Sequence, residues 1–247
     1  MSTKDTRDSQ ILNSVAQTYD TIAESWDRVR RRPGHVWNIL LPYIHDGSSV
    51  LDVGCGNGRL SEFLASKNVQ YSGIDGSKKL IEIAKHRYAS QNTKYQIPNT
   101  PSFFVAPMQA LPFTDASFDV VTCLAALQHL PSPSTRLRAL HEMHRVIRPG
   151  GRLLLTNWNL YHPHMLWRFR LISLLWGNRD VMVPWKLPDG STHLRYYHSF
   201  LVGELRSLLS QSGWTVDEIH YTNSRGRASF IKGMFSFAVA THSSSRV

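Results

Sequence analysis

The sequence has little cysteine and no long apolar run, and both absences narrow the kinds of protein that it can encode. Only Cys55 and Cys123 occur among 247 residues, which excludes a disulfide framework and a cysteine-based zinc site. The longest apolar stretch, residues 165–176, is too short to span a bilayer and contains two arginines. The first ten residues are polar and lack the apolar core of a secretory signal. We therefore expect a cytoplasmic protein without a membrane span, and we predict no metal site.

Acidic residues are scarce relative to basic ones. The chain has 18 Asp and Glu against 28 Lys and Arg, which gives a formal net charge of +10. Such an excess favours a polyanionic partner, either nucleic acid or an anionic membrane surface, although a basic surface also serves solubility alone. The hydrophobic content of 42% and the charged content of 19% are those of an ordinary globular protein. The length predicts a single domain over residues 1–247 that includes an insertion.

Residues 50–58, Val-Leu-Asp-Val-Gly-Cys-Gly-Asn-Gly, are the strongest local feature. An apolar strand runs into three glycines at alternate positions, so that backbone N–H groups can approach a ligand and a helix can start close to the strand. The spacing differs from that of the dinucleotide fingerprint. Asp52, directly before the glycines, would repel a pyrophosphate but suits a ligand with an ammonium or sulfonium group. An ordinary strand, turn and helix without a ligand is the alternative.

A second carboxylate follows at the end of the next predicted strand, residues 69–74, after a helix over 60–66. The interval is that of one βαβ unit, so Asp75 should lie at the same edge of the sheet as Asp52. There it can accept the hydroxyl protons of a ribose. The alternative for Asp75 is a turn or helix cap ahead of Ser77.

The rest of the chain alternates between helix and strand patterns. We expect an N-terminal helical segment within residues 1–46, with a helix over 9–29 that breaks near Tyr19 and Asp20. Further elements are helices over 36–41, 78–90, 135–146 and 204–211, and strands over 103–105, 117–124, 152–156, 214–221 and 230–241. Two successive strands at the C-terminus indicate an antiparallel hairpin on a doubly wound parallel sheet.

Four motifs occur in the order and at the intervals found in class I S-adenosylmethionine (SAM) methyltransferases. They are residues 51–58, Leu111-Pro-Phe113, Phe118-Asp-Val-Val121 and Arg148-Pro-Gly-Gly151. The chain resembles this family over roughly residues 15–157 and 200–241. The resemblance implies an α/β fold with a seven-stranded Rossmann-like sheet, an antiparallel C-terminal hairpin and an insertion after the fifth strand, residues 158–199. It also implies SAM as the cofactor.

The resemblance assigns the cofactor contacts by position. Asp52 and the glycine loop would line the methionine half of SAM, and Asp75 would take the ribose hydroxyls. Met108 and Gln109 would flank the adenine, and the Leu124 carbonyl would accept from the adenine amino group. The full set is Tyr19, Asp52, Gly54, Cys55, Gly56, Asp75, Met108, Gln109 and Leu124. Many relatives have an acidic residue where this chain has Pro107, so one adenine contact is absent.

The insertion over residues 158–199 interleaves aromatic and basic side chains. This composition suits splayed-out nucleotides, because rings stack on bases and cations meet phosphates. The alternative is a lid with its own small core, in which Leu171, Leu174, Leu175 and Trp176 are buried. Two stretches, residues 180–185 and 195–200, resemble the eukaryotic tRNA wobble-uridine carboxymethyl methyltransferases, although Gln128 stands where that family usually has a second histidine.

This narrower resemblance implies methylation of the carboxylate of 5-carboxymethyluridine in the anticodon loop of tRNA. The carboxylate is ionised at neutral pH, so the reaction needs no general base. By resemblance, the substrate is positioned by Arg30, Arg136, Arg195, Tyr197 and His198, with His129 lining the methyl site. A hydrogen-bonded structural histidine is the alternative for His129 and His198. The family usually works with a small zinc-binding activator subunit, for which residues 103–105 are a candidate edge or simply a buried strand.

Two other functions remain compatible with the same motifs. One is a small-molecule O- or C-methyltransferase of the quinone or natural-product type, with the insertion as a hydrophobic lid. The other is a non-catalytic subunit with the SAM fold that binds RNA or a partner.

Overall fold

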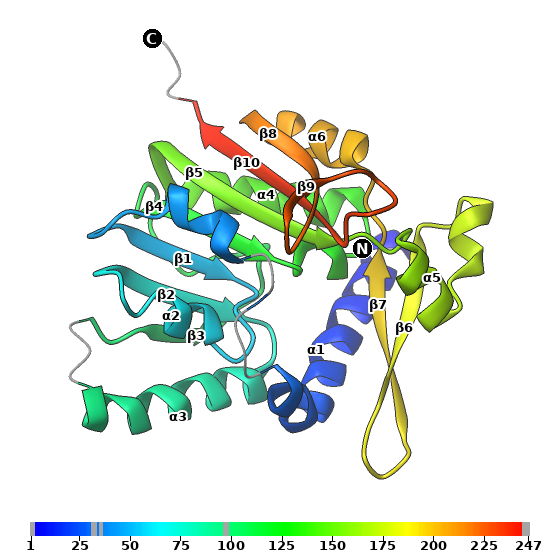
Figure 1. Ribbon diagram of the computed structural model, residues 1–247, viewed down its shortest axis with the longest axis horizontal. Coiled ribbons are helices and arrows are strands. Elements are labelled where there is room, and N and C mark those ends of the chain that lie inside the picture. Colours follow the sequence, from blue (N-terminus) through cyan, green and yellow to red (C-terminus); the bar gives the residue numbers. More distant parts are fainter. Residues whose placement is uncertain (1–2, 31–33, 35–36, 96–98, 244–247) are drawn as a thin grey trace.

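The structure is a computed structural model that describes residues 3–30, 34, 37–95 and 99–243, with an open sheet through its middle (Figure 1). The strands are β1 (Ser49–Val53), β2 (Gln70–Asp75), β3 (Ser102–Val105), β4 (Phe118–Leu124), β5 (Ile147–Trp158), β6 (Asp180–Lys186), β7 (Thr192–His198), β8 (Trp214–Asn223), β9 (Gly226–Ala228) and β10 (Phe235–His242). The main sheet has the order β3-β2-β1-β4-β5-β10-β8-β9, and β6 pairs with β7 in a separate hairpin. Strands β1 to β5 pair in parallel, whereas β10 is antiparallel to both β5 and β8.

Helices connect the strands and cover both faces of the sheet. The α-helices are α1 (Thr3–Val29), α2 (Arg59–Phe63), α3 (Lys78–Tyr95), α4 (Pro133–Val146), α5 (Pro163–Phe169) and α6 (Val202–Gln211), and the 3-10 helices are η1 (Trp37–Tyr43), η2 (Leu127–His129) and η3 (Ile172–Trp176). None of the helices in the described ranges combines the length and the apolar composition that crossing a lipid bilayer requires.

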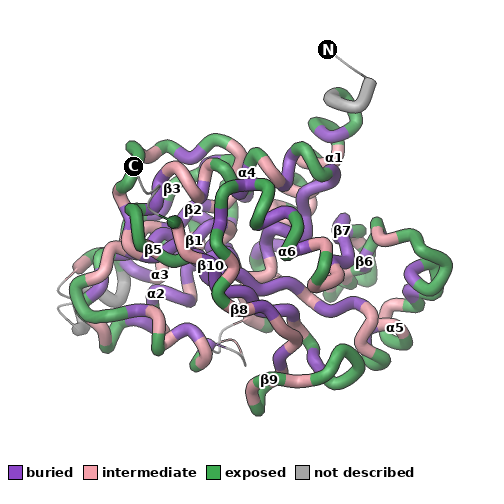
Figure 2. The backbone as a smooth tube through the Cα atoms, turned by 90° about the horizontal axis from the view of Figure 1, so that it is seen from above, coloured by how far each residue is buried: buried purple, intermediate pink, exposed green. Residues whose placement is uncertain are grey.

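The central parallel strands β1 and β4 and the second half of β5 are buried on both faces, which explains their continuous apolar runs. In β5, Leu153 and Leu155 face α4 and α6, while Leu154 between them faces the side of η1, α2 and α3. Figure 2 shows the result, with the strands of the sheet mainly purple and the segment around α5 mainly green and pink. Side chains at alternate positions of a strand therefore pack into two separate hydrophobic cores, one on each face of the sheet.

The predicted α/β architecture with an antiparallel C-terminal hairpin is confirmed, but the main sheet has eight strands where seven are predicted, and β6 and β7 form a further hairpin that is not predicted. All seven predicted strands are present, and β9 adds an eighth, three-residue strand beside β8. The last predicted strand begins at Phe235 and not at residue 230, because residues 226–228 return along β8 and residues 229–234 form the connecting loop.

The predicted break in the first helix is wrong, since α1 is continuous from Thr3 to Val29. The Asp20 carboxylate accepts hydrogen bonds from Ser77 Oγ at 2.6 Å and from the Lys79 N–H at 3.0 Å. The side chain thus caps α3 and leaves the α1 backbone helical. Ile22 and Ala23, in the next turn, are fully buried.

The segment between β5 and α6 has a small core of its own. Leu171 and Leu174 are buried in it as expected, but Leu175 and Trp176 are 66% and 86% exposed. The expectation of continuous helical spacing fails because the backbone turns through the left-handed region at Arg170 and again at Gly177. The two turns redirect the chain, so the apolar side chains of η3 divide between the core and the surface.

Gly54 lets the end of β1 lie directly against the start of η2. Its φ is +78°, and an added Cβ would lie 2.3 Å from the Cβ of Ala126. Gly54→Ala should therefore lower the free energy of unfolding by about 2 to 4 kcal/mol, from left-handed strain together with overpacking. Urea unfolding followed by tryptophan fluorescence measures this change.

Gly76→Ala is the matched control, because nothing lies within 4 Å of its added Cβ and its φ is not left-handed. The double variant Gly54→Ala/Ala126→Gly should recover the overpacking part of the loss. Equal effects of Gly54→Ala and Gly76→Ala would contradict the packing argument.

Candidate active site

One large cavity lies where the carboxyl ends of the parallel strands meet α1 and β7. Its volume is about 960 Å³, close to the upper end for small-molecule sites. All of the residues assigned to the cofactor by resemblance line it, namely Tyr19, Asp52, Gly54, Cys55, Gly56, Asp75, Met108, Gln109 and Leu124. Four of the six residues assigned to the substrate line it too, namely Arg30, His129, Arg195 and Tyr197.

The glycine loop forms the floor of this cavity. The N–H groups of Gly54 and Cys55 both donate to the Ile74 carbonyl, at 2.8 and 2.9 Å, and tie the loop to β2. Gly56 has a φ of +57°, and its added Cβ would lie 3.0 Å from the Trp26 indole of α1. The bare backbone thus lets α1 close over the loop.

Two buried carboxylates stand on either side of the loop. The oxygens of Asp52 accept from the Tyr71 hydroxyl at 2.6 Å and from Thr122 Oγ1 at 2.7 Å. Those of Asp75 accept from the Gly56 N–H at 2.9 Å and the Ser77 N–H at 2.8 Å. The contact with Ser77 is the turn role weighed for Asp75, and the contact with Gly56 shows that the same side chain also shapes the glycine loop.

Burial changes the protonation of these two groups. It raises the pKa of the Asp52 carboxyl to about 6, although the hydrogen bonds from Tyr71 and Thr122 oppose the rise. Burial also raises the pKa of Asp75, against the N–H groups of Ser77 and Gly56. A ligand with a positive charge beside Asp52 would stabilise the ionised form and recover the cost of its burial.

The wall fits SAM at both of its ends. Carboxylates face the part that would hold the ammonium, sulfonium and ribose groups. On the adenine side, the buried Nε2 of Gln109 has no hydrogen-bond partner among the described residues, so it is a donor available to a ring nitrogen. Pro107 lines the same side without an acidic group. When bound, SAM would supply a methyl group activated by its sulfonium.

A second cluster, formed by Tyr19, His129, Arg195 and Tyr197, also lines the cavity. His129 Nδ1 lies 2.8 Å from the Tyr196 carbonyl, which fixes the proton on that nitrogen. His129 Nε2 lies 3.0 Å from the Tyr19 hydroxyl and therefore accepts from it. Burial lowers the pKa of His129 to about 4, so the ring is neutral at physiological pH.

Arg195 is a buried cation without an anionic partner. It is 2% exposed, donates to the Tyr197 hydroxyl at 3.0 Å and stacks on Trp185 with its Cζ 4.9 Å from the ring centroid. No described carboxylate forms an ion pair with it, and its Nε has no hydrogen-bond partner among the described residues. Burying an unpaired charge is costly, so this arrangement points to an anion supplied by the substrate.

Tryptophans and arginines alternate along the rim of the cavity nearest α1. The Arg30 guanidinium lies 5.6 Å from the Trp26 ring and 5.5 Å from the Trp158 ring, and Arg59 lies 4.7 Å from Trp37. Of these residues, the sequence identified only Arg30 as a site residue. Their spacing in the sequence gives no signal, since only the fold brings α1, η1 and β5 together.

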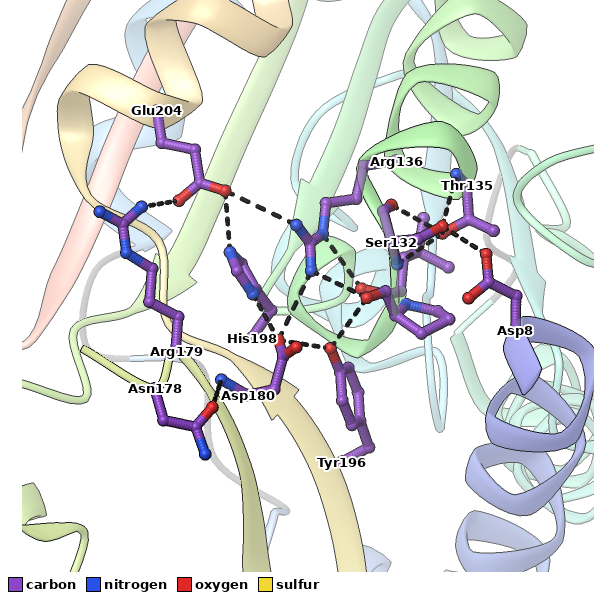
Figure 3. A network of polar contacts seen from close by, with 12 residues as sticks. Asp8, Ser132, Thr135, Arg136, Asn178, Arg179, Asp180, Tyr196, His198 and Glu204 are labelled. Carbon is purple, nitrogen blue, oxygen red and sulfur yellow. Dashed lines mark hydrogen bonds and ion pairs between the residues drawn. The ribbon is translucent and has the colours of Figure 1, made fainter. Parts of the chain in front are cut away.

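Arg136 and His198 do not line the cavity. Both belong to a polar network behind β7, drawn in Figure 3. The Arg136 guanidinium lies 3.8 Å from Asp180 and 3.6 Å from Glu204, and the two ring nitrogens of His198 lie 2.7 and 2.8 Å from the same carboxylates. This geometry does not favour direct contact between a substrate in the cavity and Arg136 or His198. Instead they hold β7 from its other face.

The alternation of side chains along β7 connects this network with the cavity. Arg195 and Tyr197 point to the cavity, while Tyr196 and His198 point to the network, where the Tyr196 hydroxyl donates to Asp180 at 2.6 Å. The backbone carbonyl of Tyr196 also orients His129. The residues that anchor β7 in the network therefore also orient Arg195, Tyr197 and His129 toward the cavity.

Comparison with known proteins identifies a family for part of the chain that lines this cavity. Residues 51–155 match the family described as methyltransferase domain. A SAM-dependent methyltransferase structure from Methanosarcina mazei has a TM-score of 0.67 and 25% identity, and the match covers 84% of this chain and 98% of that one. A chain in the complex between the Haloferax volcanii Trm112 methyltransferase activator and a methyltransferase has a TM-score of 0.66 at 19% identity, covering 94% and 99%.

Curated relatives divide into two groups. The tRNA (carboxymethyluridine(34)-5-O)-methyltransferase of Schizosaccharomyces pombe is 27% identical over 84% of this chain and 91% of its own length. The Xenopus tropicalis protein of the same name, alkbh8, is 25% identical over 80% of this chain, which spans only 37% of the frog protein. A Coxiella burnetii ubiquinone biosynthesis O-methyltransferase is 32% identical, but over 59% of this chain and 61% of its own length.

The raised pKa of Asp52 makes cofactor affinity depend on pH. The ionised carboxylate attracts a cation, and its fraction falls as the pH drops below about 6. The affinity for SAM should therefore weaken about tenfold between about pH 7.5 and pH 5, with release of a proton on binding near pH 6. Isothermal titration calorimetry in two buffers of different ionisation enthalpy measures both quantities.

Asp52→Asn should bind SAM more weakly at neutral pH and lose this pH dependence. Asp46→Asn, at an exposed turn, is the matched control and should keep the wild-type profile. If the SAM affinity of Asp52→Asn changes with pH as steeply as that of the wild type, another group titrates.

Proposed function

We propose that this chain, which is a class I SAM-dependent methyltransferase, methylates the carboxylate of a carboxymethyl group on the wobble uridine of tRNA and so forms a methyl ester. The similarity to the Schizosaccharomyces pombe tRNA enzyme supports this substrate, because it extends over 84% of the chain. The similarity to the ubiquinone enzymes covers 59%. The buried and unpaired Arg195 is the observation that carries the proposal.

Arg195 gives the cavity a site for a carboxylate. Its planar guanidinium can hold both oxygens of one carboxylate, and the Nε that lacks a partner is one of the donors suited to this contact. Tyr197, whose hydroxyl already accepts from Arg195, holds the fork in place. A substrate carboxylate would pair with the buried cation of Arg195. Because Arg195 belongs to β7, substrate binding would also stabilise this strand.

The chemistry agrees with the protonation of the cluster. An ionised carboxylate oxygen takes the methyl group without losing a proton, so no base is required. His129 is neutral, and its Nε2 is occupied by the Tyr19 hydroxyl. The chain's task is then to align the carboxylate with the methyl group and to exclude water. Tyr19 and Trp26 place α1 over the cavity for that purpose.

A tRNA substrate leads to a direct test of the product. Purified protein given methyl-labelled SAM and tRNA that contains carboxymethyluridine should label the tRNA, and mild alkali should release the label because an ester saponifies. Label that resists mild alkali would exclude the ester. Label found only in a small-molecule extract would favour the alternative function.

Arg195→Gln should reduce kcat/KM for this tRNA by about 100-fold, the effect of removing one buried charge-assisted hydrogen bond. SAM affinity and folding should persist, because the substitution removes a buried charge without a described carboxylate partner. Arg206→Gln, exposed on α6, is the control. An equal loss of kcat/KM in both variants would show that Arg195 does not bind the substrate.

We also propose that an activator subunit covers the β3 edge of the sheet. Phe104 and Val105 on this outermost strand are 41% and 47% exposed, and Phe104 packs against Phe113 with ring centroids 5.6 Å apart. An open strand edge can pair with a partner strand. The neighbour of similar fold in the Haloferax volcanii complex with an activator supports this partner.

Phe104→Lys should abolish capture of a co-expressed zinc-binding activator while leaving SAM binding intact. Leu175→Lys, an equally apolar and exposed site on η3, is the control and should retain the activator. If both variants retain the activator, the β3 edge is not its binding site.

A small-molecule methyltransferase is the second candidate. The neutral His129 favours it, since a free imidazole nitrogen can take the proton of a hydroxyl nucleophile once Tyr19 moves. The ubiquinone relatives agree with that chemistry. In this case Arg195→Gln would leave activity nearly intact.

A further inference from the structure

Two segments of the chain contain basic residues but no acidic ones. Neither residues 158–179 nor residues 219–243 include an Asp or Glu. Their cations are Arg168, Arg170, Arg179, Arg225, Arg227 and Lys232. An acid-free stretch of this length lacks the internal ion pairs that usually neutralise surface charge.

The fold places these two segments side by side. The Asn159 amide donates to the carbonyls of Phe230 and Gly233, at 2.7 and 2.8 Å, and the Asn159 N–H donates to the Met234 carbonyl at 2.9 Å. The rings of Tyr161 and Phe230 are 5.6 Å apart. In both Figure 1 and Figure 2 the loop between β9 and β10 lies beside the chain that leads into α5. We call the joined surface of residues 158–179 and 219–235 the basic rim.

The basic rim leads into the cavity. Trp158, at the start of one segment, and Phe235, at the end of the other, both line the cavity, and their ring centroids are 6.4 Å apart. Trp158 also stacks with Arg30 inside it. A polymer held on the rim would therefore lie next to the group that enters the cavity.

The cations of the rim are available to an external anion. Arg179 pairs with Glu204, but none of the other five forms an ion pair with a carboxylate in the part of the chain that the structure describes. Large rings stand among them, with Trp167 82% exposed and Trp176 86% exposed. Exposed indoles beside guanidinium groups suit unstacked bases and a phosphate backbone.

We infer that the basic rim is the surface on which the RNA substrate docks outside the cavity, with phosphates on its cations and bases on its exposed rings. The inference rests on the proposed function, in which the cavity takes one nucleotide of a tRNA. RNA is favoured over a lipid surface because the rim adjoins, through Trp158 and Phe235, a cavity that contains the buried and unpaired Arg195. A bilayer would meet the rim but could not extend into that cavity.

The test removes three charges from the loop side of the rim. Arg225→Gln/Arg227→Gln/Lys232→Gln should raise the Kd for bulk tRNA, measured by fluorescence anisotropy, by at least about tenfold. The slope of log Kd against log salt concentration should fall by about two to three, because each substituted cation leaves one phosphate without its counter-charge. SAM affinity and the urea midpoint should stay at wild-type values, since all three side chains are exposed.

The triple variant Lys67→Gln/Arg138→Gln/Lys85→Gln is the control, because it removes the same charge from elements outside the rim. If both triple variants lose the same tRNA affinity, the effect depends on net charge alone, and the inference is overturned. A second variant, Trp167→Ala/Trp176→Ala, should weaken tRNA binding without changing the salt slope, since it removes stacking alone.

Binding to vesicles of anionic phospholipid separates RNA from a lipid surface. Loss of vesicle binding in the rim variant, with tRNA affinity unchanged, would overturn the inference in favour of a membrane. If the rim variant loses tRNA affinity but the wild type forms no alkali-labile product, the docking surface stands and the proposed reaction fails. The two hypotheses can therefore fail independently.

Discussion

The site depends on one steric constraint, the approach of bare backbone to three neighbouring elements just after β1. Any side chain at Gly54 would meet Ala126 at the N-cap of η2, one at Gly56 would meet Trp26 of α1, and one at Gly58 would meet Phe103 of β3. Because the loop lies this close to all three, α1 can close over the cavity while Asp52 and Asp75 remain at its floor. Three aspartates of α1 hold this closure by bonding distant elements: Asp8 to Ser132, Asp20 to Ser77 and Lys79, and Asp27 to Asn57 and Arg87.

The opposite wall depends on the alternation of side chains along β7. One face of the strand supplies Arg195 and Tyr197 to the cavity, and the other face inserts Tyr196 and His198 among Arg136, Asp180 and Glu204 (Figure 3). Arg136 and His198 thus contact the carboxylates of Asp180 and Glu204 on the side of β7 away from the cavity. Buried charges of this kind are costly unless every partner is present, so the network has few alternative arrangements.

Charge is divided along the molecule in a way that fits two different ligands. The cavity is lined by the buried carboxylates of Asp52 and Asp75 and by the cations Arg30 and Arg195, and the basic rim adjoins it through Trp158 and Phe235. A cationic sulfonium and an anionic substrate would each meet the opposite charge. The same division explains why the excess of basic residues, visible from composition, is informative only once its location is known.

The sequence by itself determined the order of helices and strands, the glycine loop and the two carboxylates, because these depend on periodicity, turn chemistry and short spacing within βαβ units. It also pointed to Arg195 and Tyr197 through a resemblance of short motifs. It could not show that α1 is unbroken, that Leu175 and Trp176 are exposed, or that Arg136 and His198 face away from the cavity. The continuity of α1 and the placement of Arg136 were decided by tertiary structure, since they depend on contacts between residues tens of positions apart, Asp20 with Ser77 and Arg136 with Glu204. The exposure of Leu175 and Trp176 follows from the left-handed turns at Arg170 and Gly177. Only the folded chain determines which partner a polar side chain finds.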